Sequence, residues 1–147
     1  MKIRHGALQI DLPEDWSDQS SLLFVAPRDK HPARTAHPTQ QTTEAVALNF
    51  VDAQGQDAQT ILRQQSETLG AADPSFRVLA EEPFACRLGE GWLVTQTLTA
   101  ADVTLRQLCL AVVIGRIVIL ATAACSDARF ARNEAELRSI LQSLETI

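Results

Sequence analysis

The sequence predicts an α+β fold in which one curved antiparallel β-sheet packs against two helices. Apolar residues alternate with a period of two in most of the chain, they recur with a helical period in two segments, and a run of consecutive strands lies between those segments. Of the 147 residues, 46% are hydrophobic and 21% are charged. These values are typical of globular proteins, so we expect residues 1–147 to form a single domain with one core.

The charge and the cysteines restrict the partners and the compartment. The net charge is −5 and the 13 basic residues are scattered, which argues against binding to nucleic acid or to an anionic membrane surface. Asp11 and Pro13 come too early for an export signal, so we expect a cytoplasmic protein. The three widely spaced cysteines, Cys86, Cys109 and Cys125, fit a reducing compartment, and we expect buried structural thiols.

The first third of the chain predicts a hairpin and two strands. Residues 2–4 and 7–11 flank a His-Gly turn, and Trp16 is expected to fill one end of the core. The next strand, residues 21–26, is apolar on both faces, with Leu23 and Val25 on one and Leu22 and Phe24 on the other. Such a strand is covered on both sides, and the cover on the second side becomes the functional question. A long loop, residues 28–41, leads to a strand at residues 43–51.

The middle of the chain predicts a helix that begins at the capping residue Asp57 and ends near Leu69, with Gly70 as the stop. Gln65 falls in the middle of its apolar face, which consists of Ala58, Ile61, Leu62 and Leu69. Short strands are then expected at residues 76–80 and 84–88, on either side of Pro83.

The last third predicts three long strands and a terminal helix. The strands are residues 92–99, 103–114 and the second half of the apolar run 108–125. A transmembrane helix is the alternative for that run, but Gly115 and Arg116 interrupt it, so two strands are the better interpretation. Ser126 or Asp127 then caps the final helix, whose packing stripe is Phe130, Leu137, Leu141 and Leu144.

The residues alone indicate no catalytic or metal chemistry. The histidines lie in a turn and a loop, and His31 and His37 lack the further ligands that a metal site requires. No nucleophile, zinc or phosphate-loop motif is present. We therefore expect a protein that is not an enzyme and that uses no cofactor.

Side-chain amides on apolar faces are the unusual feature of this sequence. Gln107 lies on an apolar strand face with Val103, Leu105, Cys109 and Ala111, and Gln65 and Gln96 have similar positions. A buried amide without a partner costs ~1–3 kcal/mol. Each amide either bonds a nearby group of the protein or lines an apolar groove where a ligand satisfies it. A transmembrane helix with a few Ser, Thr or Gly residues is one such ligand.

Two short motifs resemble one protein family. The first runs through residues 12–27 as LP-x-x-W-x-DQS, an apolar strand and Ala-Pro, and the second is Leu105-Arg106-Gln107. They resemble the DcrB-like family with its PsbP-like fold, and within it the Eag effector-associated chaperones of type VI secretion. Nearly the whole chain agrees in size and element order, although Ser21 stands where a larger apolar residue is expected.

The resemblance implies a cytoplasmic homodimer that shields the N-terminal transmembrane helices of a secreted effector until the effector is loaded. It implies a client-binding groove made by Leu23, Val25, Leu48, Gln65 and Gln107. A protein of this kind binds apolar segments without itself inserting into a membrane. An accessory role or a small-ligand-binding role for the same fold remains the alternative.

Overall fold

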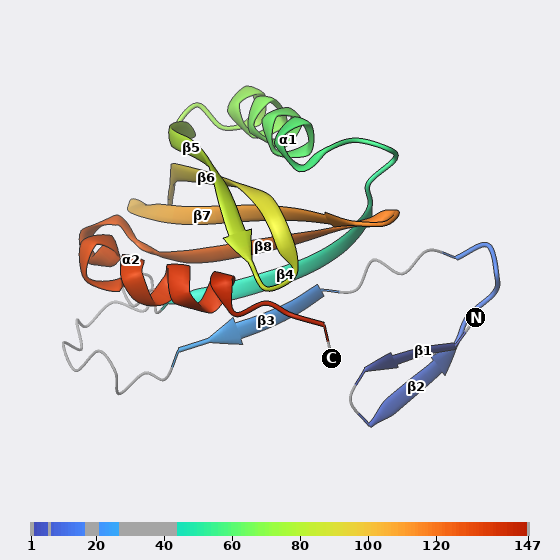
Figure 1. The fold of residues 1–147 in the computed structure, drawn as a ribbon. Helices are drawn as coiled ribbons and strands as arrows, with labels where there is room; N and C mark the ends of the chain where they lie inside the picture. The colour runs from blue at the N-terminus through green and yellow to red at the C-terminus, as the bar shows by residue number, and fades with distance from the viewer. Residues whose placement is uncertain (1, 6, 17–20, 27–43, 147) are drawn as a thin grey trace.

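The computed structural model describes residues 2–5, 7–16, 21–26 and 44–146, which form a six-stranded antiparallel sheet, a separate hairpin and two helices (Figure 1). The predicted α+β class is confirmed. In chain order the elements are β1 (Lys2–His5), β2 (Leu8–Asp11), β3 (Ser21–Val25), β4 (Ala45–Asp52), α1 (Ala58–Ala72), β5 (Arg77–Cys86), β6 (Gly89–Ala100), β7 (Val103–Ile114), β8 (Ile117–Ser126) and α2 (Asp127–Gln142).

The strand order in the sheet is β3-β4-β8-β7-β6-β5. Strands β5 to β8 form a meander in which each strand pairs with the next along the chain. Strand β4 joins this meander by pairing with β8, and β3 pairs with β4 and forms the edge. The apolar run 108–125 is thus two strands joined at Gly115 and Arg116, as the sequence predicts.

The two helices pack on opposite faces of the sheet and form a three-layered sandwich. Leu108, Leu110 and Val112 of β7 belong to the core cluster that contains Phe130, Leu137 and Leu141 of α2. Cys109 and Ala111, which alternate with them along β7, belong to a second cluster with Leu62 of α1. Each leucine buried in this way contributes ~1.5–3 kcal/mol to stability, so both layers of core hold the sheet.

Helix α1 begins where the sequence predicts and ends later. The Asp57 carboxylate accepts a hydrogen bond of 2.7 Å from the Thr60 backbone N–H, as an N-cap residue does. The helix continues through Gly70 and ends at Ala72, so the predicted stop at Gly70 is wrong. Pro74 explains the true end, because a proline disfavours the helical conformation of the residue before it; that residue, Asp73, is extended.

Strand β5 is one strand, where the sequence predicts two short strands around Pro83. It runs without a break from Arg77 to Cys86, with a bulge between Val78 and Ala80. Strand β5 is the outer strand of the sheet. Proline is tolerated there because its missing N–H can face outward without loss of a ladder hydrogen bond.

The N-terminal hairpin is present as predicted, but it forms its own two-stranded sheet (Figure 1). Leu8 and Ile10 are 77% and 55% exposed. Trp16 is 58% exposed and fills no part of the core, so that prediction is wrong. Leucines and alanines from the sheet and both helices fill the core without it. The predicted loop 28–41 lies outside the described residues.

Candidate functional site

The structure divides the five predicted groove residues between the two faces of the sheet. Leu23 and Val25 pair with Ala47 and Ala45 and share their face, which is the face of α1. Gln107 lies on this face as well, since it alternates with the α2-side residue Leu108. Leu48 pairs with Leu22 and packs with the α2-side cluster. The pairing therefore places Leu23, Val25 and Gln107 on the same face, with β4 and β8 between β3 and β7, and places Leu48 on the opposite face.

Gln65 lies on the sheet-facing stripe of α1, as the sequence predicts. It is half-buried and follows the buried Leu62 by one turn of helix. Within the part of the chain that the structure describes, its side chain makes no hydrogen bond to another residue. Its amide is therefore on the correct side of the sheet to meet a ligand held beside α1.

The α1-side surface of β3, β4 and β8 forms what we call the open face. Helix α1 packs chiefly against β6 and β7 and leaves these three strands to one side. Leu23 is 68% exposed, Val25 58% and Val51 44%. Ser21 of β3 lies on this face and is exposed as well. The half-buried residues of the open face are Ala45, Ala47, Asn49, Leu120, Thr122 and Ala124.

The open face is mainly apolar. It contains Ala45, Ala47 and Ala124, whose small side chains let another backbone approach closely. Asn49 and Thr122 add two polar groups, which can bond a backbone carbonyl or a hydroxyl of a ligand. The surface is therefore suited to an apolar segment that carries a few small polar groups.

Gln107 is hydrogen-bonded to a second side-chain amide, that of Gln96 on the neighbouring strand β6. The Nε2 of Gln96 donates a hydrogen bond of 2.7 Å to the Oε1 of Gln107. Gln96 is 3% exposed, and Gln107 is half-buried beside β8. The structure thus supplies a protein partner for one end of Gln107. Among the described residues, its Nε2 has none, so this N–H group remains for a ligand.

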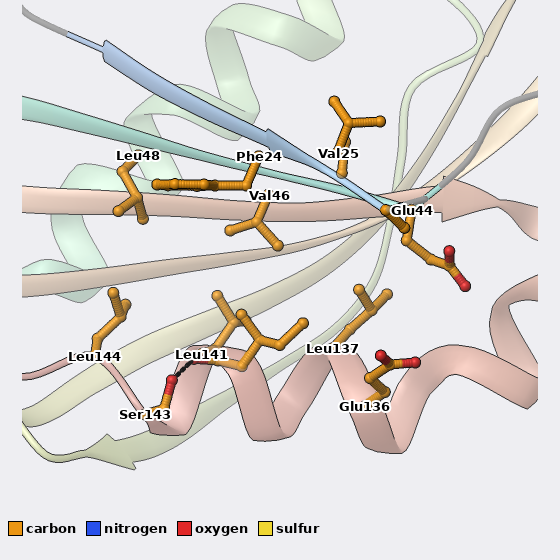
Figure 2. Close-up of a pocket in the computed structure, with 13 residues that line it drawn as sticks. Phe24, Val25, Glu44, Val46, Leu48, Glu136, Leu137, Leu141, Ser143 and Leu144 are labelled. Atoms are coloured by element: carbon orange, nitrogen blue, oxygen red, sulfur yellow. Dashed lines mark hydrogen bonds between the residues drawn. The ribbon is translucent and has the colours of Figure 1, made fainter. Parts of the chain in front are cut away.

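A pocket of about 430 Å³ lies on the other face of the sheet, between β3, β4 and α2. Figure 2 shows Phe24 and Leu48 on the strand side and Leu137, Leu141 and Leu144 on the helix side, while Val25 points away. This pocket is not among the sites predicted from the sequence. The signal was present, because Phe24 and Leu48 belong to apolar faces that alternate with those of Leu23 and Ala47.

Two carboxylates mark one end of this pocket. Glu44 is 5% exposed and Glu136 lies on α2 near it (Figure 2). Nearby, the pKa of the Cys125 thiol rises to about 11, mainly because the thiol is desolvated and secondly because Glu44 is negatively charged. The pocket therefore combines apolar walls with an acidic end.

Ion pairs anchor the two helices to the sheet. Arg138 of α2 bonds Glu82 of β5 at 2.7 Å, and Arg106 of β7 lies 2.7 Å from Asp127 at the start of α2. On the other face, Arg63 of α1 lies 3.4 Å from Glu81 of β5. These pairs are partly exposed, and pairs of this kind contribute ~0–1 kcal/mol each. They link α2 to β5 and β7 and α1 to β5, while apolar packing holds both helices on the sheet.

The described residues contain no group of three or more His, Cys, Asp or Glu that would hold a metal ion. Neither of the two described helices is long and apolar enough to cross a bilayer.

Solved structures of other proteins show which fold this chain has. The cyanobacterial PsbP protein CyanoP of Synechocystis sp. PCC 6803 matches over 94% of this chain and 99% of its own, with a TM-score of 0.57 at 8% identity. This chain has the PsbP-like fold. LpqN of Mycobacterium tuberculosis, described as involved in cell envelope biogenesis, matches with a TM-score of 0.51 at 12% identity over 97% of this chain and 86% of its own.

This chain is also similar in structure to PA94 of Pseudomonas aeruginosa, a protein of unknown function that has been suggested to be a regulator. It matches over 100% of this chain and 96% of its own, with a TM-score of 0.75 at 15% identity. No protein-family model and no curated protein matches the sequence. At these identities the likeness extends to the fold and no further.

Proposed function

We propose that this PsbP-like protein is a cytoplasmic chaperone that binds apolar helices of another protein on its open face. The observation that carries the proposal is the exposure of Leu23 and Val25 beside a floor of alanines. Exposed contiguous apolar surface of this kind marks an interaction site. The occupant that fits is an apolar helix, because small residues at a contact surface let its backbone approach closely.

The amides support a helix with a few polar positions as the ligand. Gln107 borders the open face, Asn49 and Thr122 lie within it, and Gln65 lies on the facing stripe of α1. An N–H group left without a partner on desolvation costs ~1–3 kcal/mol. A ligand with Ser, Thr or Gly residues offers hydroxyl and carbonyl acceptors to these amides and avoids that cost.

The motif resemblance supports the finer assignment. The residues 12–27 pattern and Leu105-Arg106-Gln107 resemble the Eag chaperones of type VI secretion. On this proposal the client is the N-terminal transmembrane region of a secreted effector, shielded by a homodimer of this chain before loading. The protein acts by binding and not by catalysis.

The α2-side pocket favours a second candidate, the binding of a small apolar molecule. Its volume of about 430 Å³ falls within the range of ~300–1,000 Å³ that ligand pockets occupy. Phe24, Leu48 and Leu144 would then contact the ligand in place of Leu23 and Val25.

Capture of a model helix separates the two candidates. The probe is a fluorescent 20-residue peptide of Leu, Ala, Gly and Ser with terminal lysines, and we expect the protein to keep it soluble without detergent. Leu23→Asp and Ala47→Asp each place a carboxylate on the open face and are expected to abolish capture, because burying an ionised carboxylate is costly.

Phe24→Asp is the matched control for Leu23→Asp. Phe24 is 57% exposed on the same strand, but it belongs to the opposite face. Capture that persists in Phe24→Asp and is lost in the two open-face variants supports the chaperone. The reverse pattern moves the site to the α2-side pocket. Co-expression with the N-terminal region of the protein encoded by the neighbouring gene then tests the effector assignment.

A further inference from the structure

The two edges of the six-stranded sheet differ in how they are protected. Strand β5 carries Pro83, a bulge between Val78 and Ala80 and the charged residues Arg77, Glu81 and Glu82. Proline, bulges and charges are the devices by which proteins prevent pairing at an exposed edge. Strand β3 reads Ser-Leu-Leu-Phe-Val and has none of them. An edge without these devices is a template for another strand.

The backbone groups of Leu23 and Val25 point toward that edge. The Ala26 N–H donates a hydrogen bond of 2.9 Å to the carbonyl of Glu44, the residue before β4. Inward and outward backbone groups alternate in an antiparallel pair, so Leu22 and Phe24 also bond β4 and Leu23 and Val25 face outward. None of the residues that the structure describes pairs with this outer edge.

We propose that β3 pairs antiparallel with β3 of a second copy and that this pairing is the interface of the homodimer. The inference takes the dimer from the proposed function and assigns its contact surface. Leu23 lies opposite Leu23 of the second copy across the twofold axis, and Ser21 lies opposite Val25. Strand β3 has no charged side chain, so two copies of it can face each other without repulsion between like charges. The rest of the chain carries the net charge of −5, so the uncharged edge is the part of the surface best suited to contact with a second copy.

This pairing completes the client site. A twofold axis perpendicular to the sheet keeps equivalent faces on the same side, so the open faces of the two copies become one continuous surface. In a single copy the open face has a wall only on the side of α1 and ends at β3. In the dimer α1 and its counterpart form the two outer walls, and the exposed Leu23 and Val25 lie at the centre of the floor.

Removing one outward N–H tests the interface. Leu23→Pro deletes the N–H that faces the edge and leaves the bonds of β3 to β4, while Leu23→Thr shortens the side chain and keeps the N–H. By light scattering at 10 µM we expect twice the chain mass of 16.1 kDa for the wild type. We expect a dimer from Leu23→Thr, and from Leu23→Pro a dissociation constant raised about 10- to 100-fold.

Amide hydrogen exchange of the wild type keeps the test decisive if Leu23→Pro does not fold. In the dimer the amides of Leu23 and Val25 should exchange slowly, and dilution into monomer should release them. A monomeric wild type, a Leu23→Pro variant that dissociates at the same concentration as the wild type on dilution, or a dimer whose Leu23 and Val25 amides exchange freely would overturn the interface. A dimer that behaves as expected but captures no apolar peptide would leave the interface standing and remove the proposed function.

Discussion

Removal of the Gln107 amide should destabilise the fold even in the absence of any client. The perturbation is Gln107→Met, which keeps the shape of the side chain and deletes the acceptor of Gln96. Gln96 is 3% exposed and donates its Nε2 hydrogen to Gln107 at 2.7 Å. A buried donor left without a partner costs ~1–3 kcal/mol. In a domain of this size that corresponds to a fall of roughly 3–10 °C in melting temperature.

The assay is a double-mutant cycle measured by thermal and urea unfolding. Gln96→Met and Gln107→Met each leave the other amide without its hydrogen-bond partner. The double variant removes both amides, and we expect its free energy of unfolding to lie within ~1 kcal/mol of the wild-type value. Gln65→Ala is the comparison, because the described residues offer its side chain no hydrogen-bond partner, and we expect a change of less than ~0.5 kcal/mol. A single Gln107→Met variant that melts with the wild type, together with no coupling in the cycle, would refute the reasoning.

Three further predictions concern the thiols, a helix cap and a turn. At pH 8 a thiol reagent should label Cys86, which is half-buried, and spare Cys109 and Cys125, because burial raises their pKa to about 11 and keeps them protonated; rapid loss of all three native thiols would contradict this. Hydrogen bonds from Thr60 lower the pKa of Asp57, so its stabilising effect is present above the unfolded-state pKa and is lost as the pH falls through the lower folded-state value. Asp57→Asn keeps a cap at all pH values, so its melts should lose less stability than the wild type between pH 6 and 2, and parallel curves would argue against the cap. Ala101 has φ 51° in the β6–β7 turn, a backbone conformation that is unfavourable for a residue with a side chain. Ala101→Gly should therefore raise the free energy of unfolding by ~0.5–1 kcal/mol in urea, and a lower free energy of unfolding would contradict this.

The periodic part of the fold was predictable, because period and register are local properties. Alternation along β7 and β8 and the cap at Asp57 identified these elements correctly. Errors arose where a tertiary position overrides a local signal. Pro83 lies inside β5 only because β5 is an edge strand, and Gly70 remains helical because the turn at Asp73 and Pro74 ends α1 later.

For the candidate site, the sequence predicts which residues of a single strand share a face, but not which faces of different strands lie on the same side of the sheet. Alternation placed Leu23 and Val25 on the same face and gave Gln107 its place among apolar residues. It did not show that Leu48 faces α2, because the faces of two strands can be matched only when their pairing is known. Pairing also decides that Gln96 is the partner of Gln107, and no spacing in the sequence specifies it.

The position of β4 beside β8 has a consequence for how the chain is made. Strand β4 ends at Asp52 and its partner in the sheet begins at Ile117, so a ribosome must add more than half of the remaining chain before β4 finds its neighbour. Until then the apolar strands β3 and β4 have no sheet to join, while β5 to β7 can already form hairpins from near neighbours. The open face therefore forms only after β8 has been made, and until then its two outermost strands are exposed to other chains.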